Sequence, residues 1–198
     1  YDEKLGVWKE MDSIDVILNK ACTEKREGMT DKDKNNDKYY CKTNGWVSVM
    51  DWSWDIPKDV RLNQDITYGA MTDSRDKKVY KTVKIGNQVW MAENLNYADS
   101  STILILKGKS WCHDNEPEKC AVAGRLYTWA AAIDSVALAN DSKDPLNCGY
   151  GKTCGINRGV QGICPDGWHL PTLHEWGLLR VALGNAGVAG DSLKALTG

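Results

Sequence analysis

The chain has 198 residues, of which 42% are hydrophobic and 26% charged, as expected for one medium globular domain or two small ones. Its formal net charge of −2 provides no broad basic field, so nucleic acid is not an expected partner. No apolar run is long enough for a transmembrane segment. The chain opens on Tyr1 without a signal peptide, which is expected of a mature protein or an excised fragment.

Residues 1–60 are predicted to form a small β-rich repeat region. Tyr1 and Gly6 match Tyr40 and Gly45, each displaced by 39 positions (45 − 6 = 39). A glycine turn flanked by aromatic and β-branched residues is typical of a hairpin. Stacked surface repeats are the natural interpretation, and chance similarity is the alternative.

Two segments inside this region are ambiguous. The apolar pattern of residues 13–21 fits either a helix or a strand. Residues 31–37 place oxygen-bearing side chains at alternate positions, as a calcium loop does. However, Asn36 stands where that loop needs glycine, and Lys42 stands where it needs a bidentate glutamate. A solvated, mobile loop is therefore expected instead of a calcium site.

The aromatic composition is unusual, with nine Trp, eight Tyr and no Phe. Tryptophan and tyrosine carry a polar group and suit half-exposed packing and wet interfaces, although most are ordinary core residues. Trp52 and Trp54 alternate, so on an extended segment they would share one face. They could form an aromatic platform for a sugar, while such a pair more often caps a small core. Residues 57–70 are expected to be a connector.

Residues 61–198 are predicted to form the second domain. Residues 79–85 are rich in β-branched side chains, residues 86–87 form a turn, and residues 88–91 return as a strand. The apolar run at residues 103–106 could add a strand.

Two further segments complete this domain. A surface loop is expected between Cys112 and Cys120. Residues 124–140 are predicted to be one helix whose buried stripe contains Leu126, Trp129 and Ile133.

A second helix is predicted after a tight turn at residues 164–167. Thr172 and Glu175 form a capping box, in which each side chain accepts a hydrogen bond from a free amide of the helix start. Apolar side chains then recur at helical spacing and predict a buried stripe at Leu173, Trp176, Leu179 and Leu183. The turn before the cap is expected to deliver Trp168 and Leu170 into a core.

Seven cysteines without Cys-x-x-Cys spacing favour disulfides and an oxidising compartment over a zinc site. The short intervening loops favour three pairs, Cys22–Cys41, Cys112–Cys120 and Cys148–Cys154. Cys164 is then left over, so its partner is missing from this chain, in another molecule, or absent. A reduced protein with seven free thiols is the alternative.

Three motifs in order resemble the Fibrobacter succinogenes major paralogous domain: VYKTVKIGNQVWMAENLNY at 79–97, GRLYTW at 124–129 and GICPDGWHLP at 162–171. The resemblance implies an α+β, C-type-lectin-like domain with two helices against an antiparallel sheet. It also implies a secreted or surface-exposed bacterial protein. The family's C-terminal half has no counterpart here, so the domain is expected to be truncated, which would account for unpaired Cys164.

The expected function is a non-enzymatic module for adhesion, polysaccharide binding or surface assembly, outside the cell or on its surface. Its expected partners are plant-cell-wall polysaccharide, other surface proteins or further copies of itself. One alternative is a structural subunit completed by strand exchange with a neighbour. Another is an oxidase like the formylglycine-generating enzymes. No catalytic residue, metal or cofactor is predicted, since His113, His169 and His174 show no triad spacing.

Overall fold

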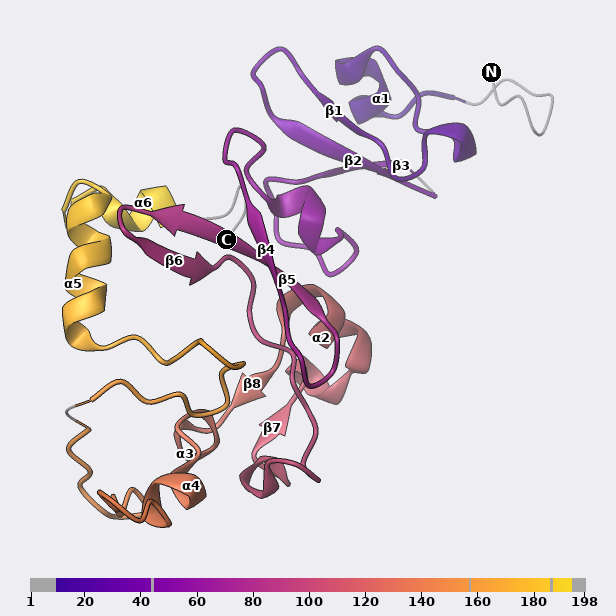
Figure 1. Cartoon of the computed structure of the whole chain (residues 1–198). Coiled ribbons are helices and arrows are strands. Elements are labelled where there is room, and N and C mark those ends of the chain that lie inside the picture. Colours follow the sequence, from indigo (N-terminus) through magenta and orange to yellow (C-terminus); the bar gives the residue numbers. More distant parts are fainter. Residues whose placement is uncertain (1–9, 44, 157, 186, 194–198) are drawn as a thin grey trace. The chain divides into compact units, whose positions relative to one another are not determined.

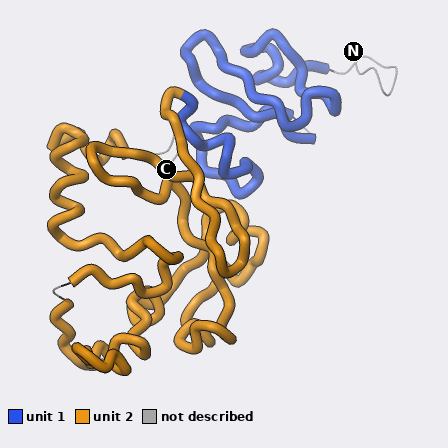
Figure 2. Tube along the Cα trace, viewed as in Figure 1, with its two compact units in different colours: residues 1–64, 194–198 blue, residues 65–193 orange. Residues whose placement is uncertain are grey.

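The computed structural model describes residues 10–43, 45–156, 158–185 and 187–193. Its elements are short helices and small antiparallel sheets, so the protein is α+β. The chain divides into two compact units, one comprising residues 1–64 and 194–198 and the other residues 65–193 (Figure 2). The helices and strands of both units are labelled in Figure 1.

The first unit is built on a three-stranded antiparallel sheet, in which β1 (Thr30–Lys32), β2 (Lys38–Lys42) and β3 (Gly45–Ser48) pair in that order. It also contains helix α1 (Ser13–Leu18) and the 3-10 helices η1 (Glu24–Arg26) and η2 (Lys58–Arg61). The ambiguous segment at residues 13–21 is therefore helical in its first part. Asp12 and Asp15 form a capping box at the start of α1, which explains why a helix begins there. Cys22, Cys41 and Trp46 form the buried core.

The acidic segment at residues 31–37 is part of a hairpin rather than a free loop. Asp31 already lies in β1. The carboxylate of Asp33 then accepts hydrogen bonds from the backbone amides of Asn35 at 2.8 Å and Asp37 at 2.9 Å. Such side-chain bonds to the following backbone define a turn, which here joins β1 to β2. The first copy of the proposed repeat runs from Tyr1 to Asp12, and its residues 1–9 lie outside the described residues.

The second unit begins with a three-stranded antiparallel sheet. Its central strand β5 (Val79–Ile85) pairs with β6 (Gln88–Met91) across the predicted two-residue turn. Strand β4 (Gly69–Thr72) pairs with the other edge of β5. Strand β4 is not predicted from the sequence, because Gly69 and Ala70 belong to residue types that are depleted in strands.

The middle of this unit differs from the prediction in two places. The run at residues 103–106 contains the 3-10 helix η3 (Leu104–Leu106) instead of a strand. The expected surface loop between Cys112 and Cys120 contains η4 (His113–Asn115) and helix α2 (Pro117–Ala123). Proline has the backbone angle that the first helical position requires, which favours a helix beginning at Pro117. On either side of this segment, β7 (Ser110–Trp111) pairs with β8 (Leu126–Tyr127).

The single helix predicted at residues 124–140 is two short helices, α3 (Trp129–Ala132) and α4 (Ser135–Ala139). Asp134 interrupts them with a left-handed φ of 47°, and its carboxylate caps α4. The predicted buried stripe is therefore wrong at Leu126 and Trp129, which are exposed, and right at Ile133, which is buried. Leu126 lies in β8 and not in a helix, and α3 is only four residues long, so one helical periodicity does not describe this segment.

The C-terminal part contains α5 (Leu173–Ala182) and α6 (Ala189–Leu193). One core cluster of the second unit joins Tyr97, Leu106, Ala131 and Ile163. Another joins Ile133, Leu138, Cys148 and Val160. Both clusters therefore use residues that precede α5, and the motif at residues 162–171, which leads into that helix, contributes Ile163 to the first cluster (Figure 1). Within the described residues, no helix has the length and apolar character needed to cross a membrane.

Candidate functional site

Three disulfides join the pairs that the sequence analysis favours: Cys22–Cys41, Cys112–Cys120 and Cys148–Cys154. The paired Cα atoms lie 5.4, 5.1 and 5.0 Å apart, a normal separation for bridged cysteines. Cys164 is a free, half-buried thiol. Burial raises the pKa of this thiol to about 11. It is therefore protonated at neutral pH and a poor nucleophile.

Trp52 and Trp54 lie together in the connection between β3 and η2. Their rings meet edge to face, with centroids 5.2 Å apart and planes at 85°, a favourable geometry for an aromatic pair. Trp52 is 51% exposed, whereas Trp54 is half-buried. The connection is not a strand. The two side chains are thus brought together by ring contact, not by alternation along an extended segment as the sequence analysis expects.

Arg61 completes this aromatic cluster. Its guanidinium carbon lies 4.2 Å from the centroid of the Trp52 ring, within the range of a cation–π contact. The Arg61 side chain also donates a hydrogen bond to the Ser53 carbonyl oxygen. Arg61 is buried, and this burial lowers its pKa. Burial and the hydrogen bond to Ser53 therefore hold the Arg61 side chain in place beside the Trp52 ring.

A second buried cation anchors the same connection. The Nζ atom of Lys38, in the central strand β2, donates to the Val60 carbonyl oxygen at 2.8 Å. Burial lowers the pKa of Lys38. Sequence reasoning assigned residues 57–70 to a connector and missed Arg61, because no local pattern relates an arginine in a 3-10 helix to a distant tryptophan.

The predicted capping box begins helix α5. The Thr172 hydroxyl accepts from the Glu175 amide at 3.3 Å, and the Glu175 carboxylate accepts from the Thr172 amide at 2.8 Å. His169 Nε2 lies 2.8 Å from the second carboxylate oxygen. The bonds from the Thr172 amide and hydroxyl, followed by the bond to His169, hold the Glu175 pKa at about 2. A carboxylate this acidic is a weak base, so the cluster acts as a helix cap.

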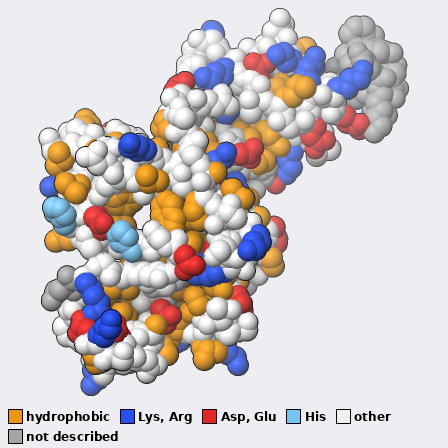
Figure 3. Space-filling view, viewed as in Figure 1, with side chains coloured by type: hydrophobic (Ala, Val, Ile, Leu, Met, Phe, Trp, Pro, Cys, Tyr) orange, Lys and Arg blue, Asp and Glu red, His pale blue; other side chains and the backbone are white. Residues whose placement is uncertain are grey.

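Some residues of helix α5 that were predicted to be buried are exposed. Leu179 is 3% exposed, but Leu173 is 90% exposed and Trp176 is 50% exposed. Trp176 packs against Trp90 of β6, with ring centroids 5.1 Å apart. The stripe prediction is wrong at Leu173 because α5 packs against the β5–β6 hairpin along one side only. Figure 3 shows hydrophobic side chains reaching the surface of the second unit. Trp168 and Leu170, expected in the core, are half-buried.

A buried ion pair joins the β4–β5 turn to the motif at residues 162–171. Asp73 accepts from Arg75 Nε at 2.8 Å and from Nη2 at 2.6 Å, and Arg75 Nη1 donates to the Ile163 carbonyl oxygen at 3.0 Å. The guanidinium also lies over the Tyr97 ring, 3.9 Å from its centroid. Asp73 is fully buried. Arg75 therefore connects three segments of the second unit.

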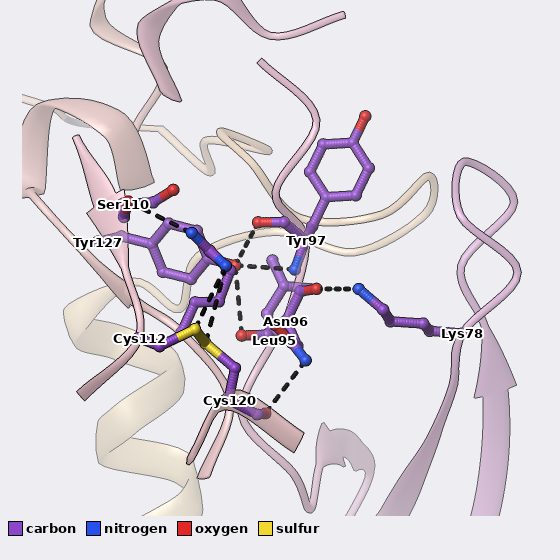
Figure 4. Close-up of a disulfide and its surroundings, with 9 residues drawn as sticks. Lys78, Leu95, Asn96, Tyr97, Ser110, Cys112, Cys120 and Tyr127 are labelled. Carbon is purple, nitrogen blue, oxygen red and sulfur yellow. Dashed lines mark hydrogen bonds between the residues drawn. A yellow bond between two sulfur atoms is a disulfide. The ribbon is translucent and has the colours of Figure 1, made fainter. Parts of the chain in front are cut away.

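A second polar network surrounds the Cys112–Cys120 disulfide (Figure 4). The Tyr127 hydroxyl accepts from the Tyr97 amide at 2.9 Å and donates to the Tyr97 carbonyl oxygen at 2.8 Å. Burial raises the pKa of Tyr127, so the phenol stays neutral and can donate. Asn96 Nδ2 donates to the Cys120 carbonyl oxygen at 3.1 Å. These bonds hold the extended segment after β6 against α2 and β8.

A pocket of about 400 Å³ lies between α4 and residues 158–162. Its charged walls are Asp134, Asp141 and Arg158, and the arginine pairs with both Asp141 and Asp144. Arg158 is therefore neutralised by the two aspartates that it contacts, while the Asp134 carboxylate is used to cap α4. The described part of the chain contains no group of three or more His, Cys, Asp or Glu side chains that could hold a metal ion.

The disulfides, the small antiparallel sheets and the capped motif before α5 define a disulfide-linked α+β module. Residues 83–197, more than half of the chain, match the Fibrobacter succinogenes major domain (Fib_succ_major). The chain belongs to this bacterial family. No curated protein and no solved structure gives a significant match to the chain.

Proposed function

We propose that the protein is a non-enzymatic module, secreted or held at the cell surface, that binds polysaccharide through Trp52. The observation that carries the proposal is the Trp52 cluster, in which a half-exposed indole rests on the buried guanidinium of Arg61 and against the ring of Trp54. A flat ring held in a fixed position can stack on the apolar face of a sugar with little loss of side-chain entropy. A plant-cell-wall polysaccharide suits such a surface.

Two observations support the location and the absence of catalysis in this proposal. Three disulfides are typical of proteins that fold in an oxidising compartment. An oxidase like the formylglycine-generating enzymes would need a reactive thiolate, whereas the pKa of Cys164 is raised to about 11. The C-type-lectin-like arrangement that the family resemblance implies is part of this proposal.

The binding proposal is tested by pull-down of the whole chain with insoluble cellulose and other plant-wall polysaccharides, followed by a glycan array. Trp52→Ala is expected to lose about five- to 150-fold in affinity, because a buried or stacked aromatic ring contributes on the order of 1–3 kcal/mol. Trp129→Ala is the matched control, since Trp129 is 66% exposed in the other unit. Absence of binding to any glycan, or an equal loss in both variants, would refute the proposal.

A structural subunit completed by a neighbour's strand is the second candidate, and the position of β6 at the edge of its sheet, within the described residues, favours it. In an antiparallel hairpin, hydrogen-bonded and non-hydrogen-bonded residue pairs alternate along the two strands. The pair Ile85–Gln88 closes the two-residue turn and is hydrogen-bonded, so the next pair, Lys84–Val89, is not. The backbone groups of Val89 and Met91 therefore point away from β5. A neighbouring strand could pair there. Light scattering of the purified chain tests this candidate, and a monomer at all concentrations would exclude it.

A further inference from the structure

The environment of the Cys112–Cys120 disulfide differs from that of an ordinary structural bridge, because a cation lies against both sulfur atoms. Arg125 Nη1 is 3.6 Å from Cys112 Sγ and 3.7 Å from Cys120 Sγ. The Nη2 atom of Arg125 also donates a hydrogen bond to the Ser110 carbonyl oxygen at 3.4 Å. Arg125 Nε is buried and has no hydrogen-bond partner within the described part of the chain. Among the described residues, no carboxylate pairs with this guanidinium.

The Cys22–Cys41 disulfide has the opposite surroundings. Cys22 Sγ lies 3.2 Å from the Lys42 carbonyl oxygen, and Cys41 Sγ lies 3.8 Å from the Thr23 carbonyl oxygen. Both bridges are buried, with all four cysteines at most 7% exposed. The sulfur atoms of Cys112–Cys120 therefore face a positively charged guanidinium, whereas those of Cys22–Cys41 face the oxygen ends of neutral backbone carbonyls.

We infer that Cys112–Cys120 is a redox-responsive site, which small thiols reduce in preference to Cys22–Cys41 because Arg125 stabilises the reduced state. A disulfide sulfur is a weak hydrogen-bond acceptor, whereas a thiolate is a strong, charged one. The uncompensated guanidinium therefore interacts more favourably with the reduced pair than with the bridge. Carbonyl oxygens beside Cys22–Cys41 would repel a thiolate and keep that bridge oxidised.

The reaction balances with two molecules of a low-molecular-weight thiol, RSH. The first thiolate attacks one sulfur, breaks the S–S bond and forms a mixed disulfide, and the released cysteine thiolate pairs with Arg125. The second thiolate attacks the mixed disulfide and releases RS–SR. Two electrons pass from the two thiols to the cysteines. The protons of the thiols go to the cysteines, or one goes to solvent while a thiolate remains beside Arg125.

Reduction would loosen one defined segment. The bridge ties the end of β7 to α2, while the far end of α2 is held independently by Asn94 Nδ2, which donates to the Ala123 carbonyl oxygen at 2.8 Å. Asn96 also binds the Cys120 carbonyl oxygen. Reduction is therefore expected to loosen residues 113–116, between Cys112 and the start of α2, while α2 stays anchored to the segment after β6. The response is local and reversible.

The test equilibrates the whole oxidised chain in glutathione buffers of graded [GSH]²/[GSSG] at pH 8, alkylates free thiols and maps each pair by mass spectrometry. Cys112–Cys120 is expected to reach half-reduction at a lower ratio than Cys22–Cys41. Arg125→Met is expected to raise the [GSH]²/[GSSG] ratio at which Cys112–Cys120 is half-reduced by about tenfold or more. This is the factor expected when the reduced state loses a charge-assisted hydrogen bond. Arg125→Lys, which keeps the charge, is expected to restore most of the preference.

The direction of the change separates this effect from misfolding. A variant that failed to fold would expose its bridges and become easier to reduce, whereas loss of Arg125 is expected to make one bridge harder to reduce. Arg180→Met removes an exposed cation of α5 and is expected to leave every half-reduction ratio unchanged. An unchanged or lower ratio for Cys112–Cys120 in Arg125→Met would overturn the inference. So would earlier reduction of Cys22–Cys41 in the unmodified chain.

Discussion

Replacing Asp73 by alanine is expected to destabilise the second unit by about 3–5 kcal/mol, the usual cost of leaving a buried charge without its partner. The Asp73 carboxylate is fully buried and accepts three hydrogen bonds from Arg75, two from the guanidinium and one from the backbone amide at 3.0 Å. The Arg75 side chain is itself only 17% exposed. In Asp73→Ala, the guanidinium keeps Ile163 and Tyr97 as neighbours but loses its counter-charge.

The same ion pair predicts how stability depends on pH. Burial alone would raise the Asp73 pKa, but the hydrogen bonds and charge of Arg75 outweigh burial and lower it. The folded state therefore releases the Asp73 proton more readily than the unfolded chain, where a carboxyl of this type titrates near about 3.9. The stabilisation is complete above about pH 4 and is lost as pH falls through the lower folded-state pKa. Asp73→Asn is expected to remove this acid-sensitive contribution.

The measurement is urea unfolding of the disulfide-intact chain, followed by near-ultraviolet circular dichroism. A double-mutant cycle with Arg75→Met should show coupling, with the double variant less destabilised than the sum of the single variants. Asp144→Ala is the control, since Asp144 pairs with Arg158 but its side chain is 64% exposed, and it is expected to cost less than about 1 kcal/mol. An Asp73→Ala cost no larger than that of the control would refute the reasoning.

Three further substitutions have defined expectations in the same unfolding assay. Tyr127→Phe should cost about 1–3 kcal/mol, because it leaves the buried amide of Tyr97 without an acceptor. Gly162→Ala should be strongly destabilising, because a Cβ there would lie 2.0 Å from the Ala132 carbonyl oxygen and the backbone has a φ of +55°. Thr172→Ala should cost about 0.5–2 kcal/mol through loss of the α5 cap.

Each of these has a matched comparison. Tyr150→Phe removes the hydroxyl of a fully exposed side chain and should leave the free energy of unfolding unchanged. Gly155→Ala places a Cβ with no neighbour within 4 Å, so a loss equal to that of Gly162→Ala would contradict the steric argument. Thr172→Ser keeps the capping oxygen and should retain most of the stability. A Ser variant as unstable as the Ala variant would show that the cap is not the cause.

Local signals in the sequence account for the parts of the fold that were predicted. The β5–β6 hairpin combines β-branched strands with a two-residue glycine turn, and the start of α5 carries a reciprocal cap at Thr172 and Glu175. Short loops between cysteines also indicated the three disulfide pairs. These features depend on residues that are near one another in the chain, which is why they can be read from a sequence.

The parts that were not predicted depend on distant contacts. The helix predicted at residues 124–140 is interrupted because the Ile163 amide takes the carbonyl oxygen of Ala132, which a continuous helix would have used. Arg61 beneath Trp52 and Arg125 beside the Cys112–Cys120 bridge are likewise set by folding of separate segments. The exposure of Leu173 follows from the single-sided packing of α5 and not from its periodicity.

The small ring closed by Cys148–Cys154 makes this chain suitable as a scaffold for displaying peptides. Between those cysteines, Tyr150 is fully exposed, and a Cβ at Gly151 would meet no atom within 4 Å. The loop is pinned at its base, where the Leu146 amide donates to the Leu138 carbonyl oxygen at 2.9 Å. Each doubling of a loop costs only about 0.6 kcal/mol in closure entropy. A foreign epitope inserted beside the exposed Tyr150 would therefore be presented in a cyclic form, with little change in the free energy of unfolding.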